Sequence, residues 1–282
     1  MTSIFMVYDI PRWEEKAIFE AARKKGVELR AVESKDQYFD IAADLRSEYG
    51  DIALQRCVSY FRSLHLTALL ESKGIKVVNG LHEAQTAGNK LFASAALIRA
   101  GVPTPKTMLS FSVVGSLKAL DDLGYPAVIK PTIGSWGRLV ALVNDRNAAE
   151  AVLEDREQMF PLYQVYYLQE KVDRPPRDIR AFVIGEQVVA AIYRVSEGGA
   201  WRTNTSRGGK ALNCPITSEL EAICLKAAKA IGVGIFGVDW METPKGLVVH
   251  EVNNTTEFRN SVPATGVDIP ALIIDYLVEQ TN

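Results

Sequence analysis

The chain has 282 residues, of which 48% are hydrophobic, and its formal net charge at pH 7 is −2. This composition excludes a disordered or fibrous protein and allows two or three compact units. It gives no electrostatic reason to expect a nucleic-acid partner. The apolar N-terminal run is too short for a signal peptide, and no apolar stretch reaches the roughly 18 residues of a membrane helix. We therefore expect no nucleic-acid partner, no membrane association and a cytoplasmic location.

The N-terminal part of the chain alternates strand and helix signals. An apolar strand at Ile4–Tyr8 precedes a helical stretch at Glu14–Lys25, which Gly26 ends. Further strands are predicted at Val27–Val32, Asp51–Leu54 and Gly74–Asn79. This order predicts a small parallel sheet covered by helices. The first strand is not followed by GxGxxG, so we expect no dinucleotide site in this unit. We place the N-terminal α/β domain at residues 1–86.

A second unit is expected at residues 87–168. A helix starts at Asn89-Lys90 and is closed by the proline-bearing connector 101–105. The strand 125–131 contains Lys130 near its end, and the glycine-containing loop 132–138 leads into a further strand at Leu139–Val143. A strand, a glycine loop and a strand together predict a flap.

A third unit is expected at residues 169–282. It opens with the end of a strand at Tyr166–Val172, and a linker follows at Arg174–Arg177. A hairpin is predicted about Gly185-Glu186, between strands at Asp178–Ile184 and Gln187–Arg194. The remaining elements are a polar loop at 201–210, helices at Glu219–Ile231 and Ile269–Gln280, and a second hairpin between the two helices.

The second hairpin carries three oxygen-bearing side chains. Glu251 and Asn253 are two residues apart, so they point to one face of a strand. A tight turn centred near Lys245 would place Asp239 roughly opposite Glu251. Acidic residues often cover only the solvated face of a hairpin, but the flanking segments here are apolar enough to be buried. Two carboxylates and an amide suit Mg²⁺ that is also held by a substrate phosphate.

Cationic and glycine-rich segments elsewhere favour an anionic ligand. The loop around Gly134 and Gly137 could bring backbone N–H groups to phosphate oxygens, although such a loop can also be a simple hairpin turn, and it lacks the GK[ST] ending of a Walker A motif. Lys130 ends an otherwise apolar strand, where a buried cation needs an anion. A further group can recognise phosphate or carboxylate, namely Arg180, Arg194, Asn204 and Arg207.

These segments, in this order, resemble the ATP-grasp ligases, and most closely the RimK-like branch, over roughly residues 87–282. The segment Glu251–Phe258, EVNNTTEF, resembles the corresponding segment of the LysX family, whose members attach α-aminoadipate to the amino-group carrier protein LysW in lysine biosynthesis. The N-terminal unit also fits the leading domain of that family. The resemblance implies an α/β chain of the α+β ATP-grasp type, with a small N-terminal parallel-sheet domain followed by two α+β lobes that clamp ATP.

The resemblance also implies roles for individual residues, with ATP and Mg²⁺ as cofactors. Lys90 and Lys130 would contact the phosphates, with Asn204 assisting, and Asp178 would face the ribose. The loop that closes over the phosphates would be Gly134, Ser135, Trp136 and Gly137, and the adenine site would be Gln169, Glu170, Lys171 and Val172. Trp136 departs from the small polar residue often found in this loop.

At the reacting end, Asp239, Glu251 and Asn253 would hold Mg²⁺, and Arg194 and Arg207 would stabilise the acyl phosphate and its transition state. The residues expected to bind the substrate are Arg180, Arg194, Asn254, Thr255 and Thr256. The implied partners are a LysW-like carrier protein and α-aminoadipate, and we expect a homo-oligomer.

Two other functions fit the same residues. One is a glutamate ligase of the same family, either the carrier ligase of arginine biosynthesis or a RimK-like enzyme that glutamylates a protein C-terminus. A one-methylene difference between substrates is worth only about 1–3 kcal/mol, so dual specificity is open. The other is a non-catalytic nucleotide-binding regulator, which would be expected to lose metal ligands or arginines.

Overall fold

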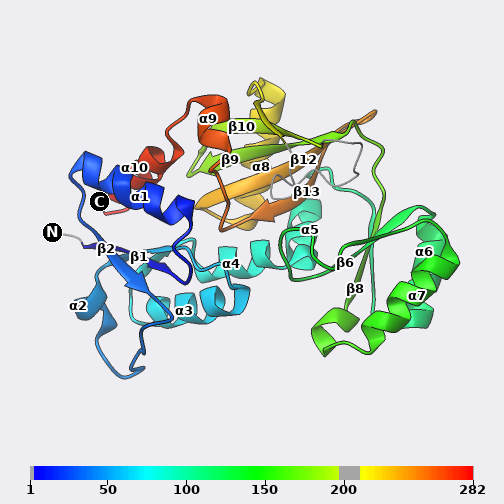
Figure 1. Ribbon diagram of the computed structural model, residues 1–282, viewed down its shortest axis with the longest axis horizontal. Helices are drawn as coiled ribbons and strands as arrows, with labels where there is room; N and C mark the ends of the chain where they lie inside the picture. The colour runs from blue at the N-terminus through cyan, green and yellow to red at the C-terminus, as the bar shows by residue number, and fades with distance from the viewer. Residues whose placement is uncertain (1–2, 197–209, 282) are drawn as a thin grey trace.

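The computed structural model of the protein describes residues 3–196 and 210–281. Three sheets follow one another along the chain, and each carries its own helices (Figure 1). The predicted α+β architecture, a parallel-sheet domain followed by two further α+β lobes, is confirmed. No helix within the described residues is long and apolar enough to cross a membrane.

The N-terminal unit contains a parallel four-stranded sheet of order β2-β1-β3-β4. Its strands are β1 (Ile4–Tyr8), β2 (Leu29–Glu33), β3 (Ile52–Gln55) and β4 (Lys76–Val78), and its helices are α1 (Trp13–Lys25), α2 (Leu45–Tyr49), α3 (Tyr60–Ser72) and α4 (Leu81–Gly88). Gly26 ends α1 as predicted, because its left-handed conformation (φ 69°) lets the following N–H groups return to the last turn. The strand predicted at Val27–Val32 begins two residues later, at Leu29.

The central lobe is an antiparallel sheet of order β5-β8-β6-β7 with two helices packed on one face, at the right of Figure 1. It comprises β5 (Thr107–Ser110), α6 (Val113–Leu123), β6 (Ala127–Pro131), β7 (Ala141–Val143), α7 (Arg146–Glu157), the 3₁₀ turn η1 (Pro161–Gln164) and β8 (Tyr166–Glu170). Helix α5 (Lys90–Arg99) leads into it from the N-terminal unit. The strand predicted from Leu139 starts only at Ala141, because Leu139 has a positive φ of 55°.

The C-terminal lobe is an antiparallel sheet of order β11-β10-β9-β12-β13. Its elements are β9 (Arg177–Ile184), β10 (Gln187–Val195), β11 (Lys210–Asn213), α8 (Ser218–Ile231), β12 (Ile235–Thr243), β13 (Gly246–Asn253), α9 (Ser261–Thr265) and α10 (Ile269–Glu279). Both predicted hairpins are present, and Gly185 makes the first turn with φ 58°. The predicted linker ends one residue early, since Arg177 already belongs to β9.

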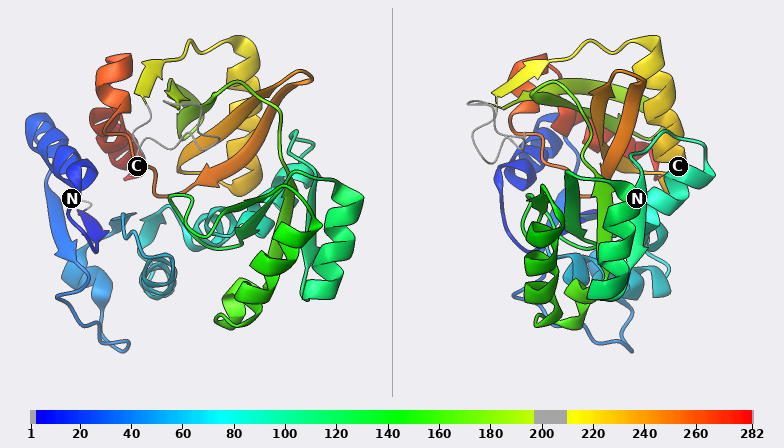
Figure 2. Two further views of the ribbon diagram at one scale, coloured as in Figure 1. Left: turned by 45° about the vertical axis from the view of Figure 1, so that its right-hand side comes forward. Right: turned by 90° about the vertical axis from the view of Figure 1, so that its right-hand side faces the viewer.

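The N-terminal and C-terminal units share a hydrophobic core. Ile4, Met6 and Ile18 from the first sheet and α1 pack in one buried cluster with Phe182 of β9 and Ile273 of α10. Helices α1 and α10 lie side by side above the N-terminal sheet in Figure 1, with residues in contact. The central lobe has a separate core. The left view of Figure 2 shows that lobe projecting from the remainder of the molecule.

Candidate active site

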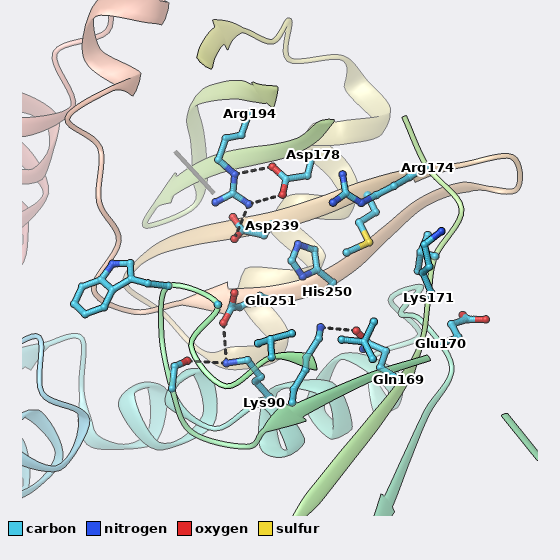
Figure 3. Close-up of a pocket in the computed structure, with 18 of the residues that line it drawn as sticks. Lys90, Gln169, Glu170, Lys171, Arg174, Asp178, Arg194, Asp239, His250 and Glu251 are labelled. Carbon is cyan, nitrogen blue, oxygen red and sulfur yellow. Dashed lines mark hydrogen bonds and ion pairs between the residues drawn. The ribbon is translucent and has the colours of Figure 1, made fainter. Parts of the chain in front are cut away.

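A first cavity, of about 280 Å³, lies between the central lobe and the C-terminal lobe (Figure 3). Strand β6, the loop after it and the end of β8 form one wall, and β9, β10, β12 and β13 form the other. Most of the residues predicted to bind ATP line it, namely Lys90, Lys130, Gly134, Ser135, Trp136, Gly137, Gln169, Glu170, Lys171, Val172 and Asp178. Segments far apart in the sequence therefore converge as predicted, while the individual roles of these residues stay predictions.

Lys130 is a buried cation in this cavity. Its ammonium donates a 2.6 Å hydrogen bond to Oε1 of Gln169, and burial lowers the pKa of Lys130 to about 8. The amide of Gln169 is oriented by its own donations to Thr107 Oγ1 and the Tyr167 hydroxyl. Gln169 therefore faces the lysine, and the lysine is held at a point where an incoming anion would relieve its desolvation.

Lys90 joins the glycine loop to the acidic hairpin. Its Nζ donates to the carbonyl of Gly134 at 2.8 Å and lies 3.0 Å from Oε1 of Glu251. Trp136 and Gly137 have positive φ values of 58° and 63°, so the loop turns sharply over the cavity. Trp136 donates its indole N–H to Glu257 at 3.1 Å, and the Arg138 guanidinium stacks over its ring at 4.9 Å. The residue that departs from the family pattern thus ties the loop to the segment after β13.

The acidic hairpin has the predicted pairing, with one addition. Asp239 is directly opposite Glu251. The next residue, Trp240, is opposite Val249, so β13 contains a β-bulge between Val249 and Glu251. His250 is the extra residue of the bulge. Without the bulge, the turn between Thr243 and Gly246 would place Asp239 opposite His250.

Asp239 is fully buried and already neutralised by arginine. It accepts a bidentate pair from Arg180, at 2.7 Å to each oxygen, and a third contact at 3.0 Å from Arg194. Burial opposes ionisation, but these two guanidinium groups outweigh it and hold the pKa of Asp239 well below its usual range.

The donor chemistry of the hairpin fits a hard divalent cation. Asp239, Glu251 and Asn253 present two carboxylates and an amide on one face, with Asn253 Nδ2 3.5 Å from Asp239 Oδ2. The described residues contain no cluster of three or more His, Cys, Asp or Glu that could hold a metal by themselves. A cation here would therefore need further ligands from a phosphate-bearing substrate or from water.

Asp178 and Arg194 form a second buried ion pair. Arg194 donates to both oxygens of Asp178, at 2.6 and 2.9 Å, and both side chains are at least nine-tenths buried. Asp178 lines the first cavity, where a ribose was predicted, but its two oxygens are engaged by the arginine. Arg194 in turn connects Asp178 to Asp239, so it holds two carboxylates of the site in place.

A second cavity, of about 910 Å³, adjoins the first on the side of the N-terminal unit. Arg180, Arg194, Asn253, Asn254 and Thr255 line it, together with residues around the start of α3. The two cavities share Lys90, Arg194 and Glu251, and also part of the glycine loop.

Thr256, predicted to bind substrate, lines none of the described cavities. Its side chain is 2% exposed and packs on Gly237, where an added Cβ would lie 2.3 Å from the threonine Oγ1. Its carbonyl accepts a hydrogen bond from Arg56. Asn204 and Arg207 lie outside the described residues.

Several residues that line these cavities were not predicted from the sequence. His250, placed by the bulge, faces the first cavity with no described hydrogen-bond partner for Nε2; burial, reinforced by Lys130, lowers the pKa of His250 to about 4. Arg174 and Met241 also line that cavity, and Arg12 and Glu257 line the second. The position of Met241 could have been predicted, because residues two apart on a strand point to the same face and Met241 lies two residues after Asp239.

Comparison with known proteins gives two family matches that together span most of the chain. Residues 87–277 match a RimK-like ATP-grasp domain, and residues 4–86 match a LysX preATP-grasp domain. The α-aminoadipate–LysW ligase LysX of Saccharolobus solfataricus is 37% identical over 273 residues, covering 96% of this chain and 98% of that protein. The glutamate–LysW ligase ArgX of Sulfurisphaera tokodaii is 31% identical over 278 residues, covering 98% of each chain.

Among solved structures, a RimK domain ATP-grasp protein from Sphaerobacter thermophilus superposes with a TM-score of 0.79 at 26% identity, covering 97% of this chain and 99% of that one. The similarity therefore extends over all three sheets.

Proposed function

Because the chain belongs to the RimK-like ATP-grasp family and is an ATP-dependent ligase, we propose that it joins α-aminoadipate to a LysW-like amino-group carrier protein in lysine biosynthesis. ATP would convert the C-terminal glutamate of the carrier into an acyl phosphate, and the α-amino group of α-aminoadipate would then form the amide bond. Because the chain belongs to a ligase family, we reject the alternative that it is a non-catalytic nucleotide-binding regulator.

The observation that carries this proposal is the junction of the two cavities at Lys90, Arg194 and Glu251. A nucleotide in the first cavity would direct its terminal phosphate to this junction, and a carboxylate and an amine could reach the same point through the second cavity. Two substrates that enter by separate cavities and meet at one cationic point gain the orientation that a condensation requires.

The nucleotide would occupy the first cavity. Its phosphates would contact Lys90 and Lys130 under the loop 134–137, with Asn204 assisting, and its base would lie along 169–172 with the ribose toward Asp178. Asp239, Glu251 and Asn253 would hold Mg²⁺, which would offset negative charge on the transferring phosphoryl group.

In the first step, a carboxylate oxygen of the carrier attacks the γ-phosphorus and ADP leaves, giving the acyl phosphate. In the second step, the neutral amine attacks the acyl carbon, the C–O bond to phosphate breaks, and the nitrogen loses a proton. Arg194 and Arg207 would stabilise the charge on the phosphate oxygens in both steps. Arg180, Asn254 and Thr255 would contact the acceptor from the wall of the second cavity, whereas Thr256 would act only by packing.

The choice of α-aminoadipate is supported by the stronger similarity to ligases of that amino acid, at 34–37% identity, than to the glutamate–LysW ligases, at 31–32%. The segment after Asn253 also resembles the aminoadipate form. The alternative remains a ligase that adds glutamate to the carrier or to another protein C-terminus.

The test is ligation by the purified protein with ATP, Mg²⁺ and carrier protein, comparing α-aminoadipate with glutamate. ADP release and the mass of the carrier are measured. We expect kcat/KM for α-aminoadipate to exceed that for glutamate by about 10-fold to 200-fold, because the two substrates differ by one methylene group. Equal values, or a preference for glutamate, would replace the proposal by its alternative.

The metal assignment is tested separately with Asp239→Asn and Glu251→Gln. Each variant should lose most of its ligation rate and should bind Mg²⁺ with ATP more weakly by calorimetry. Glu242→Gln is the matched control, because Glu242 lies on the same strand as Asp239 but is paired with Arg177 and lines no described cavity. Full activity in both test variants would refute the assignment.

A further inference from the structure

Glu257 lies in the second cavity, four residues beyond the end of β13. Its side chain is about one-third exposed, at 36%, and also lines a smaller pocket beside Arg12 and Arg259. Oε1 accepts the indole N–H of Trp136 at 3.1 Å and lies 3.5 Å from Nη1 of Arg12. Oε2 accepts no hydrogen bond from the described residues. One oxygen of this carboxylate is thus fixed, and the other is available to a ligand.

Arg12 does little to neutralise Glu257. Its guanidinium donates to both oxygens of Glu15, at 2.8 and 3.1 Å, so its contact with Glu257 is the longer and secondary one. The negative charge of Glu257 is therefore only partly compensated within the cavity.

Residues of the N-terminal unit hold the backbone on both sides of Glu257. The carbonyl before it, of Thr256, accepts from Arg56 at 3.2 Å, and the N–H groups after it, of Phe258 and Arg259, donate to Glu14. Held on both sides, the backbone cannot easily turn the carboxylate out of the cavity. Such pre-positioning is what a binding group needs.

The charges around the second cavity are unequal. Its described lining contains only two carboxylates, Glu251 and Glu257. Its cations are Arg12, Lys90, Arg138, Arg180 and Arg194. Glu251 is already paired with Lys90 and is the proposed metal ligand, so Glu257 is the remaining carboxylate among the described lining residues.

This distribution matches an amino acid with two carboxylates and one ammonium group. All of these cations except Arg138 already pair with a carboxylate, so they offer hydrogen bonds to the carboxylates of a ligand rather than a net positive charge. An ammonium group placed among them still needs an anion. We propose that Glu257 receives the α-ammonium group of the incoming amino acid and so aims the amine at the acyl phosphate. This inference rests on the proposed ligase reaction, and it assigns the carboxylate that recognises the acceptor amine.

The test compares each amino acid with its amine-free diacid. Hexanedioate is α-aminoadipate without the amine, and pentanedioate is glutamate without it, so each measures binding of the two carboxylates alone. In Glu257→Gln, KM for the amino acid should rise about tenfold or more, because a hydrogen bond between charged groups is lost. The inhibition constant of the matching diacid, and the affinity for ATP, should stay within about twofold of wild type.

Glu242→Gln is the matched control, because it makes the same change at a carboxylate that is paired with Arg177 and lines no described cavity. Its ratio of amino-acid KM to diacid inhibition constant should equal that of wild type. The inference is overturned if Glu257→Gln weakens amino acid and diacid equally, if it weakens neither, or if Glu242→Gln reproduces the selective loss. The comparison uses whichever amino acid the wild type ligates, so an error in the proposed substrate leaves this test intact.

Discussion

At the scale of single residues, burial sets the charge state of Lys130. Its pKa is lowered to about 8 in the protein without nucleotide, because the ammonium has lost most of its hydration. Bound phosphates would favour the charged form and raise that pKa. Nucleotide affinity should therefore be constant below about pH 8 and fall as pH rises above it, by up to about tenfold per pH unit.

This pH dependence is checked by measuring the dissociation constant of a non-hydrolysable ATP analogue between about pH 6.5 and about pH 9.5. Lys130→Arg is the control, because a guanidinium does not titrate in that range. The arginine variant should bind with a flatter profile. A flat profile in the wild type would show that Lys130 is not the group that the phosphates meet.

The pair Arg194 and Asp178 makes a prediction about stability. Asp178→Asn leaves the buried Arg194 guanidinium with Asp239 as its one carboxylate partner among the described residues, so the free energy of unfolding should fall by about 2–3 kcal/mol. Glu242→Gln removes the partner of the more exposed Arg177 and should cost less than about 1 kcal/mol. Urea unfolding of both variants measures the difference. Equal losses would mean that burial of the first pair has no energetic consequence.

At the scale of elements, the acidic hairpin shows how far the sequence could predict the site. Alternation and a turn centred near Lys245 predict Asp239 opposite Glu251, and this pairing is confirmed. The observed turn between Thr243 and Gly246 gives the pairing only together with the bulge at His250. The bulge shifts the alternation by one residue, since the buried Val249 and Val252 are three apart. It was not predicted because the continuous apolar run Leu247–Val249 does not show which face of the strand is buried. His250 was missed for that reason.

The ion pairs of the site could not be predicted from the sequence either. Arg180, Arg194 and Asp178 were each predicted to meet a ligand, whereas the structure pairs them with one another and with Asp239. Their partners lie on other strands of the same sheet, and the two hydrogen-bonded pairs join residues 16 and 59 apart in the chain, so no local pattern indicates the pairing. Arg56 and Glu14 hold the segment after β13 but lie in the N-terminal unit, and no sequence pattern indicates that they contact this segment.

Strand β12 supports that segment through Gly237. An added methyl group there would lie 2.3 Å from Thr256 Oγ1 and 2.9 Å from its Cβ, so Gly237→Ala should displace the segment that carries Asn254, Thr255 and Glu257. We expect a loss of about 1–3 kcal/mol in stability and a raised KM for the amino acid, with a smaller change in ATP affinity. Thermal unfolding and steady-state kinetics measure these effects.

The double variant Gly237→Ala with Thr256→Gly tests the cause. Glycine removes both atoms that the new methyl group meets, so the double variant should be more stable than the sum of the single effects predicts, by about 0.5–3 kcal/mol. Additive effects would mean that the methyl group acts elsewhere on the sheet.

At the scale of the whole molecule, the order of the three sheets followed from the sequence, but their association did not. Periodicity indicates which face of an element is buried without indicating which partner covers it. The N-terminal sheet packs with β9 and α10 in one core, although more than 150 residues separate β1 from β9 along the chain. The central lobe has its own core and meets the other units around the first cavity.

This division predicts that the N-terminal and C-terminal units unfold together and that the central lobe unfolds separately. Ile18 is fully buried in the core that the N-terminal and C-terminal units share, so Ile18→Ala should destabilise both by about 2–5 kcal/mol. Leu153 is equally buried in the core of the central lobe, and Leu153→Ala should weaken that lobe selectively. Native-state hydrogen exchange measures the opening free energy of amides in β1, β9 and β6 separately.

In Ile18→Ala, amides of β1 and β9 should lose the same protection while β6 retains its own, because the shared core opens as one unit. In Leu153→Ala, β6 should lose protection and the other two strands should keep theirs. The two substitutions remove similar apolar groups from similarly buried sites, so the comparison isolates the location of the core. Loss of protection in β1 alone after Ile18→Ala would show that the N-terminal unit opens independently, and Glu14 and Arg56 would then hold the Glu257 segment only while that unit stays docked.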